Sequence, residues 1–195
     1  MRYVALGDSY TIGTSVAESE RWPNQLVERL ESPSLELVAN LAVNGYTSRD
    51  LIEDELPRLD ALHAEFVSLL IGVNDVVQGV DGAAYAANVA FSLDRLLAHL
   101  SPERILAVGT PDYTVTPQGA AFGDPSQQSS AVRRANATLG EAAAARKIRF
   151  VPEIFELSRS EARGLVASDG LHPSGAQYAL WVDQIAPVVR ELLHE

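Results

Sequence analysis

The feature that most constrains the fold is an alternation of short apolar runs with longer segments of helical period. Five runs predict β-strands, at Tyr3–Leu6, Glu36–Asn40, Phe66–Ile71, Ile105–Gly109 and Arg149–Val151. This alternation is typical of βαβ units, in which parallel strands are joined by crossover helices. We therefore expect an α/β fold with a mostly parallel sheet of five strands.

Helical patterns occupy the intervals between these strands. The clearest extends from Asp81 to Leu100, where an apolar stripe stops before Ser101-Pro102. We expect further helices to open at Trp22-Pro23, to follow a cap at 47–50 and end near Pro57, and to lie at 132–142 and 178–192. Pro187 lies inside the last pattern and predicts a kink or a break there.

Two connections show neither helical nor alternating period. The segment 111–130 is rich in Gly, Pro, Ser, Thr and Gln, which predicts a long loop at the carboxyl end of the fourth strand. Long loops in compact domains are often functional. The stretch from the fifth strand to Asp169 is also expected to be irregular.

Composition limits the class of protein and its partners. With 195 residues, 47% of them hydrophobic, the chain is expected to form one compact domain over residues 1–195. Its 15 basic and 26 acidic residues give a net charge of -11, which repels phosphate backbones and disfavours nucleic acid as a partner. Cysteine is absent, so disulfides, thiolate metal sites and a cysteine nucleophile are excluded.

The two remaining compositional expectations concern membranes and location. No apolar run reaches the roughly 18 residues of a membrane span. Met1-Arg2 lead directly into the first predicted strand, with no room for a secretory signal, so we expect a cytoplasmic protein. The sequence implies no particular oligomeric state.

Ser9 is the candidate nucleophile. Gly7-Asp8-Ser9 follows the first predicted strand directly, so the serine is expected on the turn that leaves it. Ligands of open α/β sheets bind just beyond the carboxyl ends of the strands. By itself such a serine also fits a helix cap or a phosphate-binding turn.

Asp169 and His172 form the candidate base pair. A carboxylate three residues before a histidine, in a non-helical segment, can accept the Nδ1 proton and leave Nε2 free to act as general base. Pro173 holds the backbone of His172 extended. Alone, the pair equally fits an aspartate that caps the last helix beside a surface histidine.

Gly45 and Asn74 are candidate oxyanion donors. Each follows a predicted strand, so both are expected at the same edge of the sheet as Ser9. A backbone N–H at Gly45 and the amide of Asn74 suit the stabilisation of a developing oxyanion. Each residue also fits ordinary turn or cap chemistry.

Taken together, these motifs resemble those of the SGNH hydrolase superfamily, also called GDSL esterases and lipases. G-D-S, a Gly after the second strand, G-x-N-D after the third and D-x-x-H-P near the end occur in the family order across nearly the whole chain. Tyr10 stands where the GDSL pattern has leucine.

The resemblance implies a flavodoxin-like three-layer α/β/α sandwich with a five-stranded parallel sheet. It also implies ester hydrolysis through an acyl-serine intermediate. Ser9 would be nucleophile and oxyanion donor, Gly45 and Asn74 the other donors, and His172 the base oriented by Asp169. Two aspartates would give structural support, Asp8 and Asp75.

The expected function is that of a serine esterase acting on small-molecule esters such as short acyl esters, acetylated sugars or lysophospholipids. The alternative is a silent or acyl-transferring member of the same fold that binds acylated carbohydrate or protein. The substrate pocket is expected to draw on Tyr10, Tyr46, Val76, Val77, Tyr113, Phe122 and Leu171.

Metal and nucleotide chemistry is not expected. The four histidines, at 63, 99, 172 and 194, lack metal-ligand spacing, so we expect no metal. The loop after the first strand lacks both the P-loop ending and the dinucleotide fingerprint. No cofactor is therefore expected.

Overall fold

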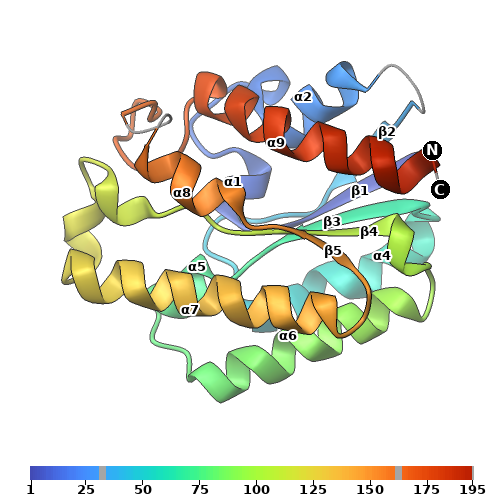
Figure 1. Ribbon diagram of the computed structural model, residues 1–195, viewed down its shortest axis with the longest axis horizontal. Coiled ribbons are helices and arrows are strands. Elements are labelled where there is room, and N and C mark those ends of the chain that lie inside the picture. The colour runs from blue at the N-terminus through green and yellow to red at the C-terminus, as the bar shows by residue number, and fades with distance from the viewer. Residues whose placement is uncertain (31–33, 161–163, 195) are drawn as a thin grey trace.

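A five-stranded parallel sheet forms the centre of the computed structural model, which describes residues 1–30, 34–160 and 164–194 (Figure 1). The strand order is β2-β1-β3-β4-β5. The strands are β1 (Arg2–Gly7), β2 (Glu36–Asn40), β3 (Phe66–Leu70), β4 (Ile105–Val108) and β5 (Arg149–Val151). The predicted strands are thus confirmed to within a residue at each end.

Helices cover both faces of the sheet, which confirms the three-layer α/β/α fold (Figure 1). One face carries α1 (Ser9–Ile12), α2 (Trp22–Arg29), α8 (Glu153–Arg159) and α9 (Gly175–His194). The other carries α4 (Leu56–Leu62), α6 (Gly82–Leu97) and α7 (Pro125–Ala144). The short helices α3 (Ser48–Asp50) and α5 (Val73–Val77) follow β2 and β3.

Alternation along the strands divides the core into two layers. In β1, Tyr3 and Ala5 pack with the α2 and α9 side, whereas Val4 and Leu6 pack with the α6 side. Successive side chains of a strand point to opposite faces, so a strand covered on both faces is buried along its length. The sheet is therefore a rigid platform whose carboxyl edge can hold reacting groups.

The predicted long loop at 111–130 is wrong in its second half. Short 3₁₀ turns span Tyr113–Val115 and Gly119–Phe122, and α7 already begins at Pro125. The Asp124 carboxylate caps the helix by accepting the Gln127 N–H at 2.9 Å. Because the first turns of α7 carry exposed Ser and Gln, they show no apolar period that could predict a helix.

The expected helix end near Pro57 is also wrong. Residues Leu51–Glu55 form a π-helical turn, and α4 then continues from Leu56 to Leu62. Pro57 is the second residue of α4 and directly follows the π-helical turn, and the helix continues past it. The helix instead ends at His63, whose φ is +48°.

The C-terminal third differs from expectation at two points. The stretch after β5 contains α8, which was not predicted, while residues 161–163 of that stretch lie outside the described residues. Helix α9 continues through Pro187, so the predicted break is wrong. The buried residues of α9 anchor it on both sides of the proline, which outweighs the loss of one backbone hydrogen bond.

Candidate active site

Ser9 is positioned by the sharp turn between β1 and α1. The Asp8 carboxylate caps α1 by accepting the Tyr10 N–H at 3.0 Å, and Ser9 is the first helical residue. Gly7 has φ +146°, and a Cβ there would lie 2.2 Å from the Leu70 carbonyl oxygen. The turn therefore requires glycine, and it places Ser9 at the carboxyl edge of the sheet.

Asp169 and His172 form a compact pair in the segment before α9. The Nδ1 of His172 lies 2.7 Å from Asp169 Oδ2, and since a carboxylate can only accept, Nδ1 carries the proton. The other oxygen, Oδ1, accepts the N–H groups of Leu171 at 2.9 Å and His172 at 3.0 Å. The ring of Tyr10 lies 5.5 Å from the imidazole, centroid to centroid. These contacts hold the imidazole in one orientation.

The ionised form of the Asp169 carboxyl group is strongly favoured. Burial acts to raise its pKa, but hydrogen bonds from Ser15, His172 and two backbone N–H groups outweigh that effect and hold the pKa well below its ordinary value. A carboxylate that stays ionised over the working pH range keeps the Nδ1 proton in place. Nε2 of His172 is thereby left as the acceptor.

A cavity of about 270 Å³ brings residues from both ends of the chain together. Its lining contains Ser9 and His172, five of the seven predicted pocket residues, and three other residues: Ser9, Tyr10, Asn44, Val73, Asn74, Val77, Tyr113, Phe122, Leu171 and His172. Asn44 and Val73 were not singled out from the sequence. The cavity combines a nucleophile and a base with apolar and aromatic walls.

Two predicted pocket residues lie elsewhere. The Tyr46 hydroxyl donates to Asp54 at 3.0 Å, and Val76 lines a different cavity between α6 and α7. Val76 and Val77 are adjacent on the short helix α5, so they face different directions. The position of a residue just after a strand predicts at which edge of the sheet it lies, but not the direction in which its side chain points.

The predicted oxyanion donors belong to two neighbouring loops. Asn74 Nδ2 donates one proton to the Tyr46 carbonyl at 2.9 Å, and an amide carries a second N–H. Gly45 has φ +86°, and its carbonyl accepts from Gln78 Nε2 at 3.0 Å. Asn74 lines the cavity. From the loop after β2, the cavity lining contains Asn44 and not Gly45. These side-chain bonds fasten the loop after β2 to α5.

The Asp75 carboxylate holds α5 to the neighbouring helices through a hydrogen-bond network. Its carboxylate accepts the Ser48 N–H at 2.9 Å and the Ser48 hydroxyl at 2.5 Å, and Asn88 Nδ2 donates to the same hydroxyl at 3.0 Å. Burial raises the pKa of Asp75. The network links α5, α3 and α6 behind the cavity.

A second buried acid, Glu55, lies behind the Ser9 turn. It is fully buried, and its Oε2 accepts the Gly7 N–H at 2.9 Å. Burial, with the nearby charge of Asp8, raises the pKa of Glu55 to about 9, and burial raises that of Asp8 to about 8. One oxygen of each carboxyl has no hydrogen-bond partner among the described residues. The raised pKa values favour the protonated form of both acids near neutral pH.

Glu55 and Ser15 were not singled out from the sequence as site residues. In the sequence, Glu55 shares a helical apolar stripe with Leu51 and Leu56, and this position could have indicated a buried acid. No local pattern marks Ser15, whose hydroxyl donates to Asp169 Oδ2 at 2.7 Å from 154 positions away.

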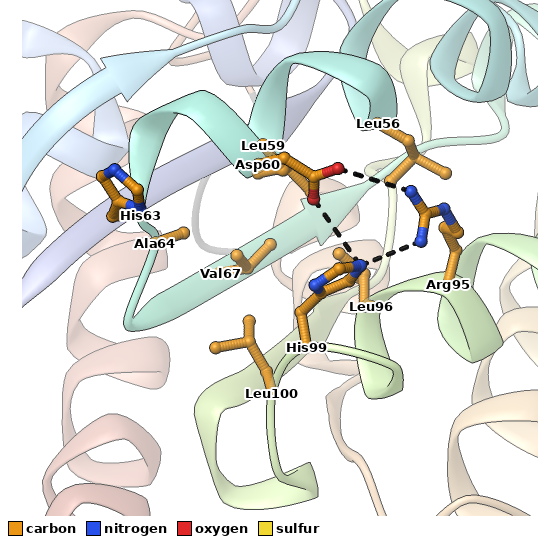
Figure 2. Close-up of a pocket in the computed structure, with 10 residues that line it drawn as sticks. All are labelled: Leu56, Leu59, Asp60, His63, Ala64, Val67, Arg95, Leu96, His99 and Leu100. Carbon is orange, nitrogen blue, oxygen red and sulfur yellow. Dashed lines mark hydrogen bonds and ion pairs between the residues drawn. The ribbon is translucent and has the colours of Figure 1, made fainter.

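A second cavity, of about 310 Å³, lies between α4 and α6 and contains none of the candidate site residues. Figure 2 shows Asp60 and His99 turned toward Arg95 in this cavity. Arg95 lies 2.9 Å from His99 Nε2 and 3.6 Å from Asp60, so the charged groups satisfy one another. We therefore place the chemistry at the carboxyl edge of the sheet.

The described residues offer neither a metal-binding cluster nor a helix that could span a membrane. Residues 1–30, 34–160 and 164–194 hold no cluster of three or more His, Cys, Asp or Glu able to bind a metal ion. None of the helices in that part of the chain combines the length and apolarity that crossing a bilayer requires.

The chain is similar in sequence to known proteins. A model of the GDSL-like lipase/acylhydrolase family matches residues 5–180. The chain is 25% identical to esterase TesA of Pseudomonas aeruginosa over 195 residues, which covers 97% of this chain and 88% of that protein.

Solved structures share the fold. A crystal structure of TesA has a TM-score of 0.77 at 22% identity, covering 98% of this chain and 99% of that one. A G-D-S-L family lipolytic protein from Veillonella parvula has a TM-score of 0.74 at 18% identity, with 98% and 97% covered. A variant of an acetyl xylan esterase from Geobacillus stearothermophilus has 0.72 at 18%, with 96% and 94% covered.

Proposed function

Because this chain belongs to the GDSL-like lipase/acylhydrolase family and is a carboxylic ester hydrolase, we propose that Ser9, His172 and Asp169 carry its reaction. The observation that supports this most directly is the shared cavity. Ser9, at the start of α1, and His172, held by Asp169, line the same hollow although they come from opposite ends of the chain.

The proposed reaction has two steps. In the first, Ser9 Oγ attacks the ester carbonyl carbon while His172 Nε2 takes the hydroxyl proton, and the tetrahedral intermediate expels the alcohol, which receives that proton. In the second, a water attacks the acyl-serine while His172 Nε2 takes its proton, and the bond to Ser9 Oγ breaks as Oγ receives that proton and the acid leaves. Asp169 stabilises the imidazolium that forms in each step.

The oxyanion is proposed to bind N–H groups of Ser9, Gly45 and Asn74. Asn74 lines the cavity beside Ser9, and its bond to the Tyr46 carbonyl orients the amide. Donors fixed before the reaction stabilise developing charge without reorganisation. Asp75 and Glu55 are proposed to support these loops from the buried side.

We propose uncharged esters with short acyl groups as substrates. The cavity volume of about 270 Å³ is slightly below the usual range for ligand pockets, roughly 300–1,000 Å³. Apart from Ser9, Asn44, Asn74 and His172 its lining is apolar or aromatic, and it contains neither Lys nor Arg to pair with a charged acyl group. The name of one structural neighbour, an acetyl xylan esterase, agrees with a small acyl group.

The test is hydrolysis of p-nitrophenyl acetate and its longer-chain homologues by the wild type and Ser9→Ala, with Ser19→Ala as the control at an exposed serine. We expect turnover to be lost only in Ser9→Ala, and a serine-reactive phosphonate to label Ser9 in the wild type. Activity retained by Ser9→Ala, or a label on another residue, would contradict the proposal. Products formed with a competing alcohol separate hydrolysis from acyl transfer.

A further inference from the structure

Asp169 Oδ2 accepts hydrogen bonds from two side chains. The His172 imidazole donates from Nδ1 and the Ser15 hydroxyl donates from Oγ, each at 2.7 Å. The other carboxylate oxygen, Oδ1, accepts hydrogen bonds from the N–H groups of Leu171 and His172. Ser15 is therefore the one side chain besides His172 that the described structure places on this carboxylate.

The backbone of Ser15 is held in an uncommon conformation. Its φ is +67°, in the left-handed region that side-chain-bearing residues rarely adopt. The described residues contain two others of this kind, His63 and Lys147. Ser15 follows Gly13, which ends α1, so the loop that carries its hydroxyl begins at the helix of Ser9. Backbone strain of this kind is often retained at functional sites.

We propose that Ser15 is a positioning residue, which fixes the Asp169 carboxylate against His172 and shares the charge of Oδ2. The inference rests on the proposed function of Ser9, His172 and Asp169. The Ser15–Asp169 hydrogen bond links the segment that follows the nucleophile to the segment that carries the base. Among the hydrogen bonds that lower the pKa of Asp169, the one from Ser15 has the largest effect.

The chemical consequence follows from the sharing of Oδ2. Without the Ser15 hydroxyl, more negative charge on Oδ2 faces the imidazole and stabilises its protonated form. A protonated His172 cannot accept the Ser9 proton, so activity is lost at a higher pH than in the wild type. A carboxylate held by one side chain fewer also aligns the imidazole less well, which lowers kcat.

Other titratable groups near Asp169 do not produce this effect. Tyr10 on α1 and Tyr178 on α9 interact with the Asp169 charge, and Arg21 and Asp8 interact with Tyr178. Burial raises the pKa of both tyrosines above the ordinary value, so neither changes charge in the acidic range. Burial raises the pKa of Asp8 to about 8, but Asp8 is present in the wild type and in every Ser15 variant, so a difference between their acidic limbs reports the loss of the Ser15 hydroxyl.

The main test variant is Ser15→Gly, since glycine adopts positive φ freely and only the hydroxyl is lost. We expect kcat on a short p-nitrophenyl ester to fall roughly 3- to 10-fold, as for the loss of one ordinary hydrogen bond, because Ser15 acts on His172 only through the carboxylate. KM should stay unchanged, and the acidic limb should move to higher pH. Ser15→Thr keeps a hydroxyl and should keep the wild-type limb even if its Tm falls. Ser19→Gly is the control at an exposed serine.

The outcomes separate this inference from the proposed function. A wild-type kcat and acidic limb in Ser15→Gly, beside an inactive Ser9→Ala, would overturn only the role of Ser15. A loss seen in Ser15→Ala but not in Ser15→Gly would assign the effect to backbone conformation and also overturn it. Full activity of Ser9→Ala would instead overturn the function on which the inference rests.

Discussion

Replacing the buried acid behind the nucleophile turn, Glu55→Gln, should stabilise the protein at neutral pH. Glu55 is fully buried and accepts the Gly7 N–H at 2.9 Å through one oxygen. Glutamine has the same shape, keeps a carbonyl oxygen for that N–H, and is neutral at every pH. The variant therefore mimics the protonated form that burial imposes on Glu55.

The magnitude follows from the difference between folded and unfolded pKa. Burial raises the pKa of Glu55 in the folded state from about 4.5 to about 9. Between these values the folded chain binds a proton that the unfolded chain has lost, so stability falls as the pH rises. The slope is about 1.4 kcal/mol per pH unit, which gives a cost of roughly 3 kcal/mol at pH 7. Glu55→Gln removes this cost.

The assay is the free energy of unfolding in urea for both proteins between pH 4.5 and pH 8. Because Asp8 is present in both, its own titration contributes to both curves. We expect nearly equal stability at the acidic end and an advantage for Glu55→Gln that grows with pH to about 3 kcal/mol at pH 7. Glu53→Gln, at a half-exposed glutamate of the same turn, is the matched control and should show no such growth.

Two results would refute the reasoning. A stability difference that stays constant across the pH range would mean that Glu55 does not titrate differently in the folded and unfolded states. A Glu55→Gln protein less stable than wild type at pH 7 would mean that the carboxyl is ionised and required as an anion.

Two further predictions concern the cavity. Asn74→Ala should lower kcat on the order of 10²-fold, because the variant loses a proposed oxyanion donor. Steady-state kinetics on p-nitrophenyl acetate measure this change. An unchanged kcat would exclude Asn74 as an oxyanion donor. Phe122→Ala should raise KM for the same ester roughly fivefold at constant kcat, because the Phe122 ring, edge-on to Tyr113 at 5.7 Å, lines the cavity without touching the reacting atoms. A fall in kcat alone would contradict that assignment.

Strand positions were predictable because their signal is local. The run Phe66–Ile71 is apolar at every position except Ser68, since β3 is covered on both faces. Helix boundaries were harder to predict wherever polar residues begin a helix. Asp124-Pro125 starts α7 in a segment that reads as a loop, because the turns that follow are solvated and need no apolar stripe.

The candidate site was predictable where chemistry coincides with a strand end. Ser9 and Asn74 were singled out on that basis and His172 from its spacing to Asp169, and all three line one cavity. Val76 was also at a strand end but points into another cavity, because the direction of a side chain on a short helix depends on how the helix packs.

The sequence by itself determined the five strands and the longer helices between them, the turn that carries Ser9, and the pairing of Asp169 with His172 three residues away. These features arise from the period of apolar residues and from turn chemistry, which act over a few residues. Only the tertiary structure decided that Glu55 is buried against Gly7 and that Ser15 reaches Asp169. Such contacts join segments far apart in the chain, and they exist only because the packing of helices on both faces of the sheet brings those segments together.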